Sequence, residues 1–341
     1  MKIALDIYGG DNSPYAPIDG AAEFLKVHSG EDIKVLLSGD ESLIRRYMSE
    51  KGYPTENIEI LNAPTEITCH DDPMTAVRSM PDSSMMTAIK AVSEGKADAV
   101  VSSGSTGALY MGSILKLKRI KGVSRPALTP LLPTLKNTST LLIDSGANAD
   151  CKPEQLAQFA VIGSAYMQAF FGIESPRVAL VCNGTEDEKG NVLTKEAHAL
   201  IKDLPINFVG NVESREALSG NVDVLVCDGF TGNVLLKSIE GTVKAFSSIL
   251  KSELKSSFIS MIGALLVKGR LSNIKKRFDY REVGGAMLLG LSGCVIKAHG
   301  SSDATAYKNA LEKAKTFTEH DTIGIMTRKM ESIAAANADN N

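Results

Sequence analysis

Cysteine pairs of the kind that hold metals or staple small domains are missing from this sequence. Its five cysteines are an odd number, and no two of them form a C-x-x-C pair. Structural zinc sites and small secreted domains both depend on such pairs. We therefore expect no zinc site and no disulfide framework, and the reducing cytoplasm is the expected location.

An excess of charge and a long apolar run are missing as well. The chain has 37 basic and 40 acidic residues, a formal net charge of −3, so a general nucleic-acid-binding role is excluded and any basic site has to be local. The longest apolar stretches, residues 159–173 and 258–267, are too short or too broken to span a bilayer. The chain also opens directly on a strand-like run, without a signal-peptide pattern.

What the sequence does contain is a repeated pattern of apolar, strand-like runs that end in glycine loops. The pattern occurs at residues 5–11, 35–40, 100–104, 142–146, 180–184 and 225–229. Helix-like stretches follow most of these runs, for example after Pro153, which stands where a first helical residue is expected. Buried strands that alternate with helices predict a mostly parallel sheet with both faces covered. In such sheets ligands bind beyond the carboxyl ends of the strands, where the glycine loops gather.

Two of these loops share the motif Gly-x-Thr-Gly between a strand and a helix. They are residues 103–108, S-G-S-T-G-A, and residues 228–233, D-G-F-T-G-N. One interpretation is two independent tight turns. The other is that both loops face one cleft and offer backbone N–H groups and a hydroxyl to an anion. The second predicts that the anion-binding residues are Gly104, Thr106, Gly107, Asp228, Gly229, Thr231 and Gly232. Neither loop matches a Walker-type or a dinucleotide-binding motif.

Two further loops carry side chains that can act on an anionic substrate. Lys189 lies in a polar loop that follows the strand at residues 178–181, and its ammonium can stabilise a phosphate or an oxyanion. The alternative is a solvated loop. His299 lies in the loop K-A-H-G-S-S-D, which begins at Lys297, and it can act as an acid, a base or an anion donor, or be structural.

Other reactive residues are weaker candidates. Cys151 precedes a helix and stands beside Lys152, which favours a thiolate, but capping explains the stretch as well. His70 has Cys69 and two aspartates beside it, yet adjacent residues rarely bind one metal ion. Asp6 and Asp144, each at the end of a strand, are expected to cap loops.

The stretch from Leu254 to Arg281 differs from the rest of the chain. Residues 251–281 contain eight basic residues and two acidic ones, and apolar residues recur at helical spacing between them. One interpretation is a core or dimer helix with solvated lysines. We favour a protruding, basic amphipathic helical hairpin at about residues 250–282, whose apolar tip rests in the interface of an anionic membrane. Its predicted membrane contacts are Leu254, Phe258, Met261, Ile262 and Leu265.

Four motifs together resemble a known family. The motif D-G-F-T-G-N at residues 228–233 fits the pattern of the phosphate acyltransferases of bacterial phospholipid synthesis, which move an acyl chain from acyl carrier protein to inorganic phosphate. The motifs C-K-P-E at residues 151–154, K-G-N at 189–191 and K-A-H-G-S-S-D at 297–303 fit it too. The resemblance covers about residues 1 to 325. The chain departs from the family's pattern at Ser105 and Cys182, among other positions.

The resemblance implies both a fold and a reaction. The fold is a three-layer α/β/α unit like isopropylmalate dehydrogenase and phosphotransacetylase, in a homodimer. Lys189 and Asn233 are then the strongest catalytic candidates, with His299 beside them, and Lys297 is a phosphate- or substrate-binding candidate. The partners are acyl carrier protein, phosphate and the inner face of the cell membrane, bound reversibly, with no cofactor, metal or nucleic acid. Alternatives are a coenzyme A thioester as donor, or a non-catalytic protein that recruits partners to the membrane.

The expected organisation is a single catalytic unit over residues 1–330, with two lobes as an alternative. The last residues, 331–341, are rich in alanine and asparagine and are expected to be frayed.

Overall fold

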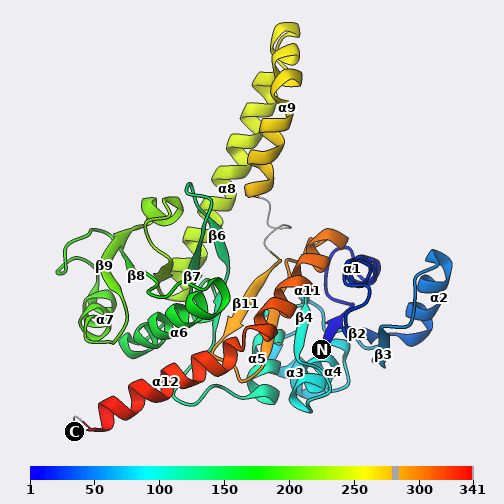
Figure 1. Ribbon diagram of the computed structural model, residues 1–341, viewed down its shortest axis with the longest axis horizontal. Coiled ribbons are helices and arrows are strands. Elements are labelled where there is room, and N and C mark those ends of the chain that lie inside the picture. The colour runs from blue at the N-terminus through cyan, green and yellow to red at the C-terminus, as the bar shows by residue number, and fades with distance from the viewer. Residues whose placement is uncertain (279–283, 340–341) are drawn as a thin grey trace.

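The strands of the protein form two mostly parallel sheets with helices packed around both (Figure 1). A computed structural model describes residues 1–278 and 284–339. The α/β class and the mostly parallel strands are confirmed. The sequence suggested one sheet, whereas the strands divide between two, because pairing partners are chosen over long sequence distances that a local pattern does not encode.

The first sheet has seven strands in the order β3-β2-β1-β4-β12-β11-β5. Strand β11 runs antiparallel to both of its neighbours, and the other pairs are parallel. The carboxyl ends of β1, β4 and β12 therefore meet at one edge. The strands are β1 (Lys2–Asp6), β2 (Lys34–Gly39), β3 (Ile58–Asn62), β4 (Ala99–Ser102), β5 (Ala127–Thr129), β11 (Ala286–Leu289) and β12 (Cys294–Lys297).

The second sheet has five strands in the order β6-β7-β10-β8-β9, and only β6 is antiparallel. The carboxyl ends of β7, β10 and β8 are adjacent, so the loops that follow them are neighbours. The strands are β6 (Leu131–Pro133), β7 (Ser139–Ile143), β8 (Val178–Cys182), β9 (Phe208–Glu213) and β10 (Val224–Val226).

Helices join the two sheets into one body. Helix α6 is buried along most of its length, and its Phe159 belongs to a continuous apolar core that also contains Ile3 of the first sheet and Leu141 of the second. The helices of the body are α1 (Tyr15–Val27), α2 (Glu41–Lys51), α3 (Pro73–Ser79), α4 (Ser84–Ser93), α5 (Thr106–Leu117), α6 (Pro153–Phe171), α7 (Val192–Lys202), α11 (Ala304–Glu319) and α12 (Thr322–Asp339), with a 3₁₀ turn, η1 (Ser214–Leu218).

Helix α12 corrects the expectation of a frayed tail. It continues to Asp339, past the point at which fraying was expected. Met326, Met330 and Ile333 are buried, and α12 packs on α6. Burial of this face stabilises a helix that the alanine-rich and asparagine-rich sequence by itself does not predict.

Helices α8 (Gly229–Leu254) and α9 (Phe258–Arg277) lie side by side and extend away from the body (Figure 1). Phe258 is 73% exposed and Leu265 is 71% exposed, so the chain by itself does not bury this surface in its core. Among the described residues, no helix is apolar over a length that would cross a bilayer.

Most of the exposed apolar residues of α9 lie in its first half, next to the tip. Exposed apolar side chains occupy residues 258–267, next to the tip, and the basic residues begin at Lys268. Phe246 and Ile249 on α8 add exposed apolar surface toward the same end. Arg281 lies outside the described residues.

Candidate functional site

The N-terminus of helix α5 presents unpaired backbone N–H groups at the end of strand β4. Ser105 caps the helix: its Oγ accepts from the N–H of Ala108 at 3.4 Å, and its carbonyl accepts from Leu109 at 2.9 Å. The N–H groups of Ser105, Thr106 and Gly107 have no acceptor within the described part of the chain. Three free N–H groups at the positive end of a helix dipole are suited to bind an anion.

Gly104 has a packing role in this loop. Its N–H already donates to Oγ of Ser102 at 3.1 Å. A Cβ on Gly9, whose φ is +85°, would lie 2.4 Å from the Cα of Gly104. The two glycines therefore let the loops after β1 and β4 pack backbone against backbone, which places the free N–H groups of α5.

The loop at residues 228–233 does not repeat this arrangement, although its sequence does. The Asp228 carboxylate caps α8, accepting from the N–H of Thr231 at 2.8 Å and from its hydroxyl at 2.7 Å. The N–H of Gly229 donates to the carbonyl of Asn148 at 2.7 Å, and that of Gly232 to the carbonyl of Asp228. As a correction to the sequence analysis, these groups are used within the protein, and a carboxylate stands where an anion was expected.

The glycines of this loop serve close packing of the protein against itself. A Cβ on Gly232 would lie 1.9 Å from the carbonyl oxygen of Asp144. A Cβ on Gly229 would lie 2.6 Å from the carbonyl oxygen of Asn148. The first turn of α8 therefore rests on the loop at residues 144–148.

Asp144 organises that loop, as the sequence predicted for a capping residue. Its carboxylate accepts from the N–H groups of Leu128, Gly146, Ala147 and Asn148. Burial raises the pKa of Asp144, and these hydrogen bonds oppose the increase. The result is a fixed platform beneath the start of α8.

Asn233 lies on this platform with its side chain exposed. A Cβ on Gly146 would lie 3.7 Å from Oδ1 of Asn233, so the amide lies directly beside a residue without a side chain. Asp228 holds the capping position of α8, so Asn233 is not the cap. The exposed amide is therefore available to a ligand.

Lys189 lies in the loop that follows β8, next to β10 in the second sheet. Its backbone N–H donates to the carbonyl of Glu186 at 3.0 Å, and its stem crosses Gly184, where a Cβ would lie 2.8 Å from Cγ of the lysine. The ammonium is exposed and has no ion pair among the described residues, whereas the nearby Asp187 pairs with Lys202 at 2.9 Å. Lys189 is thus a cation free to meet an anionic group.

His299 lies in the loop after β12 of the first sheet, within electrostatic range of Lys237 on α8. Nδ1 accepts from the N–H of Ser301 at 3.2 Å, so in the neutral ring the proton is on Nε2. His299 is exposed, but partial desolvation of its ring, and then the positive charge of Lys237, lower its pKa, which favours the neutral ring. His299 is therefore suited to donate a hydrogen bond through Nε2.

Lys237, which the sequence analysis did not single out, lies within electrostatic range of His299. It lies one helical turn after Asn233 on α8, pairs with Glu240 at 2.7 Å, and acts electrostatically on His299. The spacing of four residues from Asn233 would have placed both on one face of the helix.

Lys297 has a different position from the one expected of a phosphate ligand. Its Nζ is buried and donates to the carbonyls of Ser103, at 2.9 Å, and Ala298, at 2.5 Å. Burial lowers its pKa to about 8. It ties the end of β12 to the loop before α5, so its contacts hold that loop in place.

Asp6 supports the same loop from below. It accepts from the hydroxyl of Ser84 at 2.6 Å and from that of Ser102 at 2.7 Å, and burial raises its pKa to about 6. These bonds link the ends of β1 and β4 with the start of α4, so Asp6 has a structural role.

Cys151 is not arranged as a nucleophile. Burial, and then the charge of Asp144, raise the pKa of its thiol to about 11, which contradicts the thiolate that its neighbour Lys152 suggested. The sequence pattern overstated the effect of Lys152 because it contains no information about the burial of the thiol.

The described residues hold no cluster of three metal-binding side chains. Near His70, the Asp71 carboxylate accepts from Thr68 at 2.7 Å, and Asp72 caps α3. These carboxylates have structural hydrogen bonds of their own.

The structure thus brings some of the predicted residues together and leaves others apart. Lys237 and Glu240 of α8, the helix that carries Asn233, act electrostatically on His299, and Lys297 supports the α5 loop. The Lys189 side chain contacts neither Asn233 nor His299 within the described residues. Lys189 follows β8, and Asn233 lies near the start of α8, which follows the adjacent strand β10.

Three comparisons relate the chain to known proteins. A family model described as "Fatty acid synthesis protein" matches residues 1–324. A phosphate acyltransferase of Alkaliphilus oremlandii is 46% identical over 333 residues, which cover 98% of each chain. One of Clostridium acetobutylicum is also 46% identical, over 98% of this chain and 100% of the relative.

A solved structure supports the fold. A phosphotransacetylase of Streptococcus pyogenes superposes with a TM-score of 0.60 and 18% identity, over 97% of this chain and 94% of the other. At this identity the likeness concerns the fold alone, and it confirms the predicted phosphotransacetylase-like architecture.

Proposed function

Because this chain belongs to the family of phosphate acyltransferases, we propose that it transfers a fatty acyl group from acyl carrier protein to inorganic phosphate. The products are acyl phosphate, a precursor for phospholipid synthesis, and the free carrier. The observation that carries this proposal is the N-terminus of α5, where three unpaired N–H groups and the Thr106 hydroxyl can hold phosphate.

The chemistry needs no protein nucleophile. A phosphate oxygen attacks the thioester carbonyl carbon, a C–O bond forms, and collapse of the tetrahedral intermediate breaks the C–S bond. The carrier leaves as a thiolate and takes up a proton. This agrees with the protonated state of Cys151.

The enzyme has to bring two substrates together and stabilise an oxyanion. We assign the α5 N-terminus, with Gly104 and Gly107 shaping it, to phosphate. Lys189 and Asn233 are assigned to the oxyanion and the phosphate charge, and His299 to a hydrogen bond through Nε2. The loop at residues 228–233 then acts by placing Asn233 rather than by binding the anion itself.

The test is a direct assay with purified protein, a long-chain acyl-acyl carrier protein and phosphate. We expect acyl phosphate and free carrier thiol to appear in equal amounts. Product from an acyl-coenzyme A thioester, with none from the acyl carrier protein, would favour a phosphotransacetylase-like activity. No product from either donor would contradict the proposal and favour a non-catalytic role.

Chelation of metal ions is expected to leave this activity unchanged. The reason is that the proposed mechanism stabilises charge with N–H groups and an ammonium, without a metal ion or a nucleotide. The measurement compares initial rates with and without EDTA. A rate abolished by EDTA and restored by a divalent cation would contradict the prediction.

We further propose that the α8–α9 hairpin binds the inner face of the cell membrane reversibly. Its end carries exposed apolar side chains, including Phe258, Ile259 and Leu266, and Lys251 and Lys255 lie near them. Apolar residues at a tip and cations beside it suit an anionic lipid interface. Each basic residue there contributes on the order of 1 kcal/mol of attraction, so binding should weaken as salt rises.

Substitution of Leu265 or Met261 by glutamate is expected to release the protein from anionic vesicles without loss of activity in solution. Both side chains are exposed, so the fold should tolerate the change. Vesicle flotation measures binding. Leu135→Glu is the matched control, because Leu135 is 72% exposed outside the hairpin and should leave binding unchanged.

The same variants test the alternative in which the hairpin is a subunit interface. A homodimer is part of the proposal, and sedimentation measures it. If Leu265→Glu or Met261→Glu yields monomers or precipitates, the apolar surface is an interface between subunits and the membrane assignment is wrong.

A further inference from the structure

A second basic region lies outside the hairpin and has no role in the mechanism above. Between Lys116 and Arg125 the sequence has five basic residues and no acidic one. Four of them, Lys118, Arg119, Lys121 and Arg125, are exposed in the loop that joins α5 to β5. We call residues 116–125 the basic loop.

The cations of the basic loop have no ion pairs among the described residues. This differs from other exposed parts of the surface, where Arg45, Lys202 and Arg328 pair with carboxylates of the same chain. Arg119 donates instead to the carbonyl of Ser124. Unpaired charges of one sign in one segment create a local positive potential in a protein of net charge −3.

The backbone of the basic loop is fixed. The N–H of Ile120 donates to the carbonyl of Gly290 at 3.0 Å, and the N–H of Ser292 to that of Lys118 at 3.2 Å. Val123 and Ile120 are buried beneath the loop. The backbone of the loop therefore does not have to be ordered when a partner binds.

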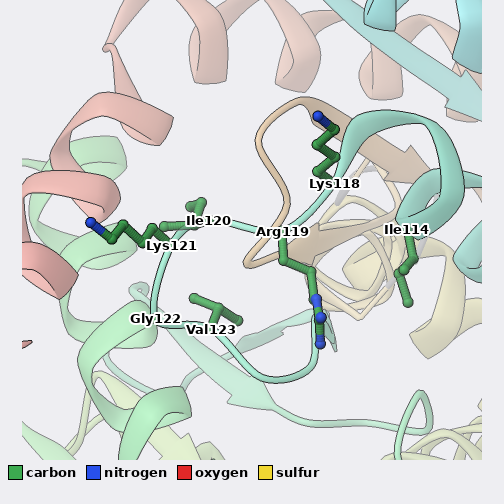
Figure 2. A pocket seen from close by; sticks show the side chains of 7 residues that line it. All are labelled: Ile114, Lys118, Arg119, Ile120, Lys121, Gly122 and Val123. Atoms are coloured by element: carbon green, nitrogen blue, oxygen red, sulfur yellow. The ribbon is translucent and has the colours of Figure 1, made fainter.

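The shape of this region argues against a site for one small anion. A cavity of about 390 Å³ is lined by Ile114 and residues 118–123. Figure 2 shows that the side chains of Lys118, Arg119 and Lys121 point in different directions and do not converge. Charge spread over a broad face suits a macromolecular surface better than a single phosphate group.

The end of the basic loop adjoins the proposed active site. Arg125 acts electrostatically on Tyr110 and Cys151. The carbonyl of Pro126 accepts from Nδ2 of Asn148 at 2.7 Å, and the carbonyl of Asn148 accepts from the N–H of Gly229 at 2.7 Å. The loop thus leads through two hydrogen bonds to the first turn of α8, close to Asn233.

We propose that the basic loop is the docking surface for an acidic protein, which is the acyl carrier protein if the proposed function holds. Carboxylates on the carrier would pair with the cations of the loop, and the thioester would enter the site past Arg125. Complementary charge of this kind accelerates association and fixes the orientation of the partner.

A lipid surface is the less favoured partner for this region. The basic loop follows α5, which lies in the body of the molecule away from the tip of the α8–α9 hairpin (Figure 1). Residues 116–125 contain no exposed large apolar side chain, and the nearest one is Leu115 on α5, whereas the hairpin carries a series of them. A protein that binds lipid through the hairpin tip can therefore keep the basic loop for a soluble partner.

The test uses the full-length double variant Arg119→Glu/Lys121→Glu. Binding of fluorescently labelled acyl carrier protein is measured by anisotropy, and kcat/KM is measured with acyl-acyl carrier protein and with an acyl-N-acetylcysteamine thioester, which lacks the protein. We expect the Kd for the carrier to rise by roughly tenfold or more, and its salt dependence to become weaker. Activity with the small thioester should stay that of the unmodified protein.

The matched control is Lys26→Glu/Lys51→Glu, which changes the charge equally at exposed lysines on α1 and α2. It should leave carrier binding unchanged. An unchanged Kd in the basic-loop variant, or an equal loss in the control, would overturn the docking proposal. Loss of binding to anionic vesicles by the basic-loop variant, with carrier binding intact, would overturn it in favour of lipid. Carrier binding through the loop without any acyl phosphate would instead contradict the proposed function and leave the docking surface standing.

Discussion

Replacing Lys189 with alanine is expected to lower kcat by roughly 100- to 1,000-fold and leave the fold intact, because loss of one oxyanion or phosphate donor has an effect of this size. The lysine is exposed in a loop and has no ion pair among the described residues, so nothing in the core depends on it. Steady-state kinetics with acyl-acyl carrier protein and phosphate measure the effect, and circular dichroism checks the fold.

Lys195→Ala is the matched control for this change. Lys195 is also exposed, and it lies on α7 just after the same loop, so its removal alters the local charge equally. Its activity should be that of the unmodified protein. A folded Lys189→Ala protein with normal kcat would remove the residue from the mechanism, and equal losses in both variants would reduce its role to general electrostatics.

Replacing Asn233 with alanine is expected to lower kcat by about 100-fold or more with little change in melting temperature. Its amide is exposed beside Gly146, and Asp228 already caps α8, so stability does not rest on it. The structure thus assigns helix capping to Asp228 and leaves Asn233 available for catalysis, two roles that are easily confused at a helix N-terminus. Kinetics and thermal unfolding, measured on the same preparation, distinguish them.

Two further variants complete this prediction. Ser238→Ala, at an exposed position on the same helix, should change neither activity nor stability. Asp228→Ala should lower the melting temperature, because loss of a side-chain cap costs about 1 kcal/mol. If Asn233→Ala lowers only the melting temperature and keeps full kcat, its catalytic assignment is wrong.

The membrane and docking assignments connect the two basic regions of the chain to different partners. Apolar residues accompany the cations of the hairpin, whereas those of residues 116–125 adjoin the start of α8 through Asn148. An acyl phosphate with an apolar tail would then be released by an enzyme held at the bilayer. Both assignments can fail independently, since each has its own variant and its own measurement.

The sequence by itself determined the local elements of this protein. Runs of β-branched and aliphatic residues that end in glycine form strands followed by loops, and Pro153 begins α6 as expected. Capping by Asp303 and Asn191 is likewise local, because the acceptor and the donor lie three residues apart. Hydrogen bonds between residues that are close in the sequence can therefore be predicted from the sequence itself.

Only the tertiary structure decided which of two similar loops leaves backbone N–H groups without an acceptor among the described residues. The loops at residues 103–108 and 228–233 share a motif, yet the second directs a backbone N–H to Asn148, about 80 residues away along the chain. The pKa of Cys151 and the proximity of Lys237 to His299 were decided in the same way. Burial, hydrogen-bond partners and electrostatic neighbours depend on how the two sheets pack, and a motif contains no information about residues that the fold brings from elsewhere.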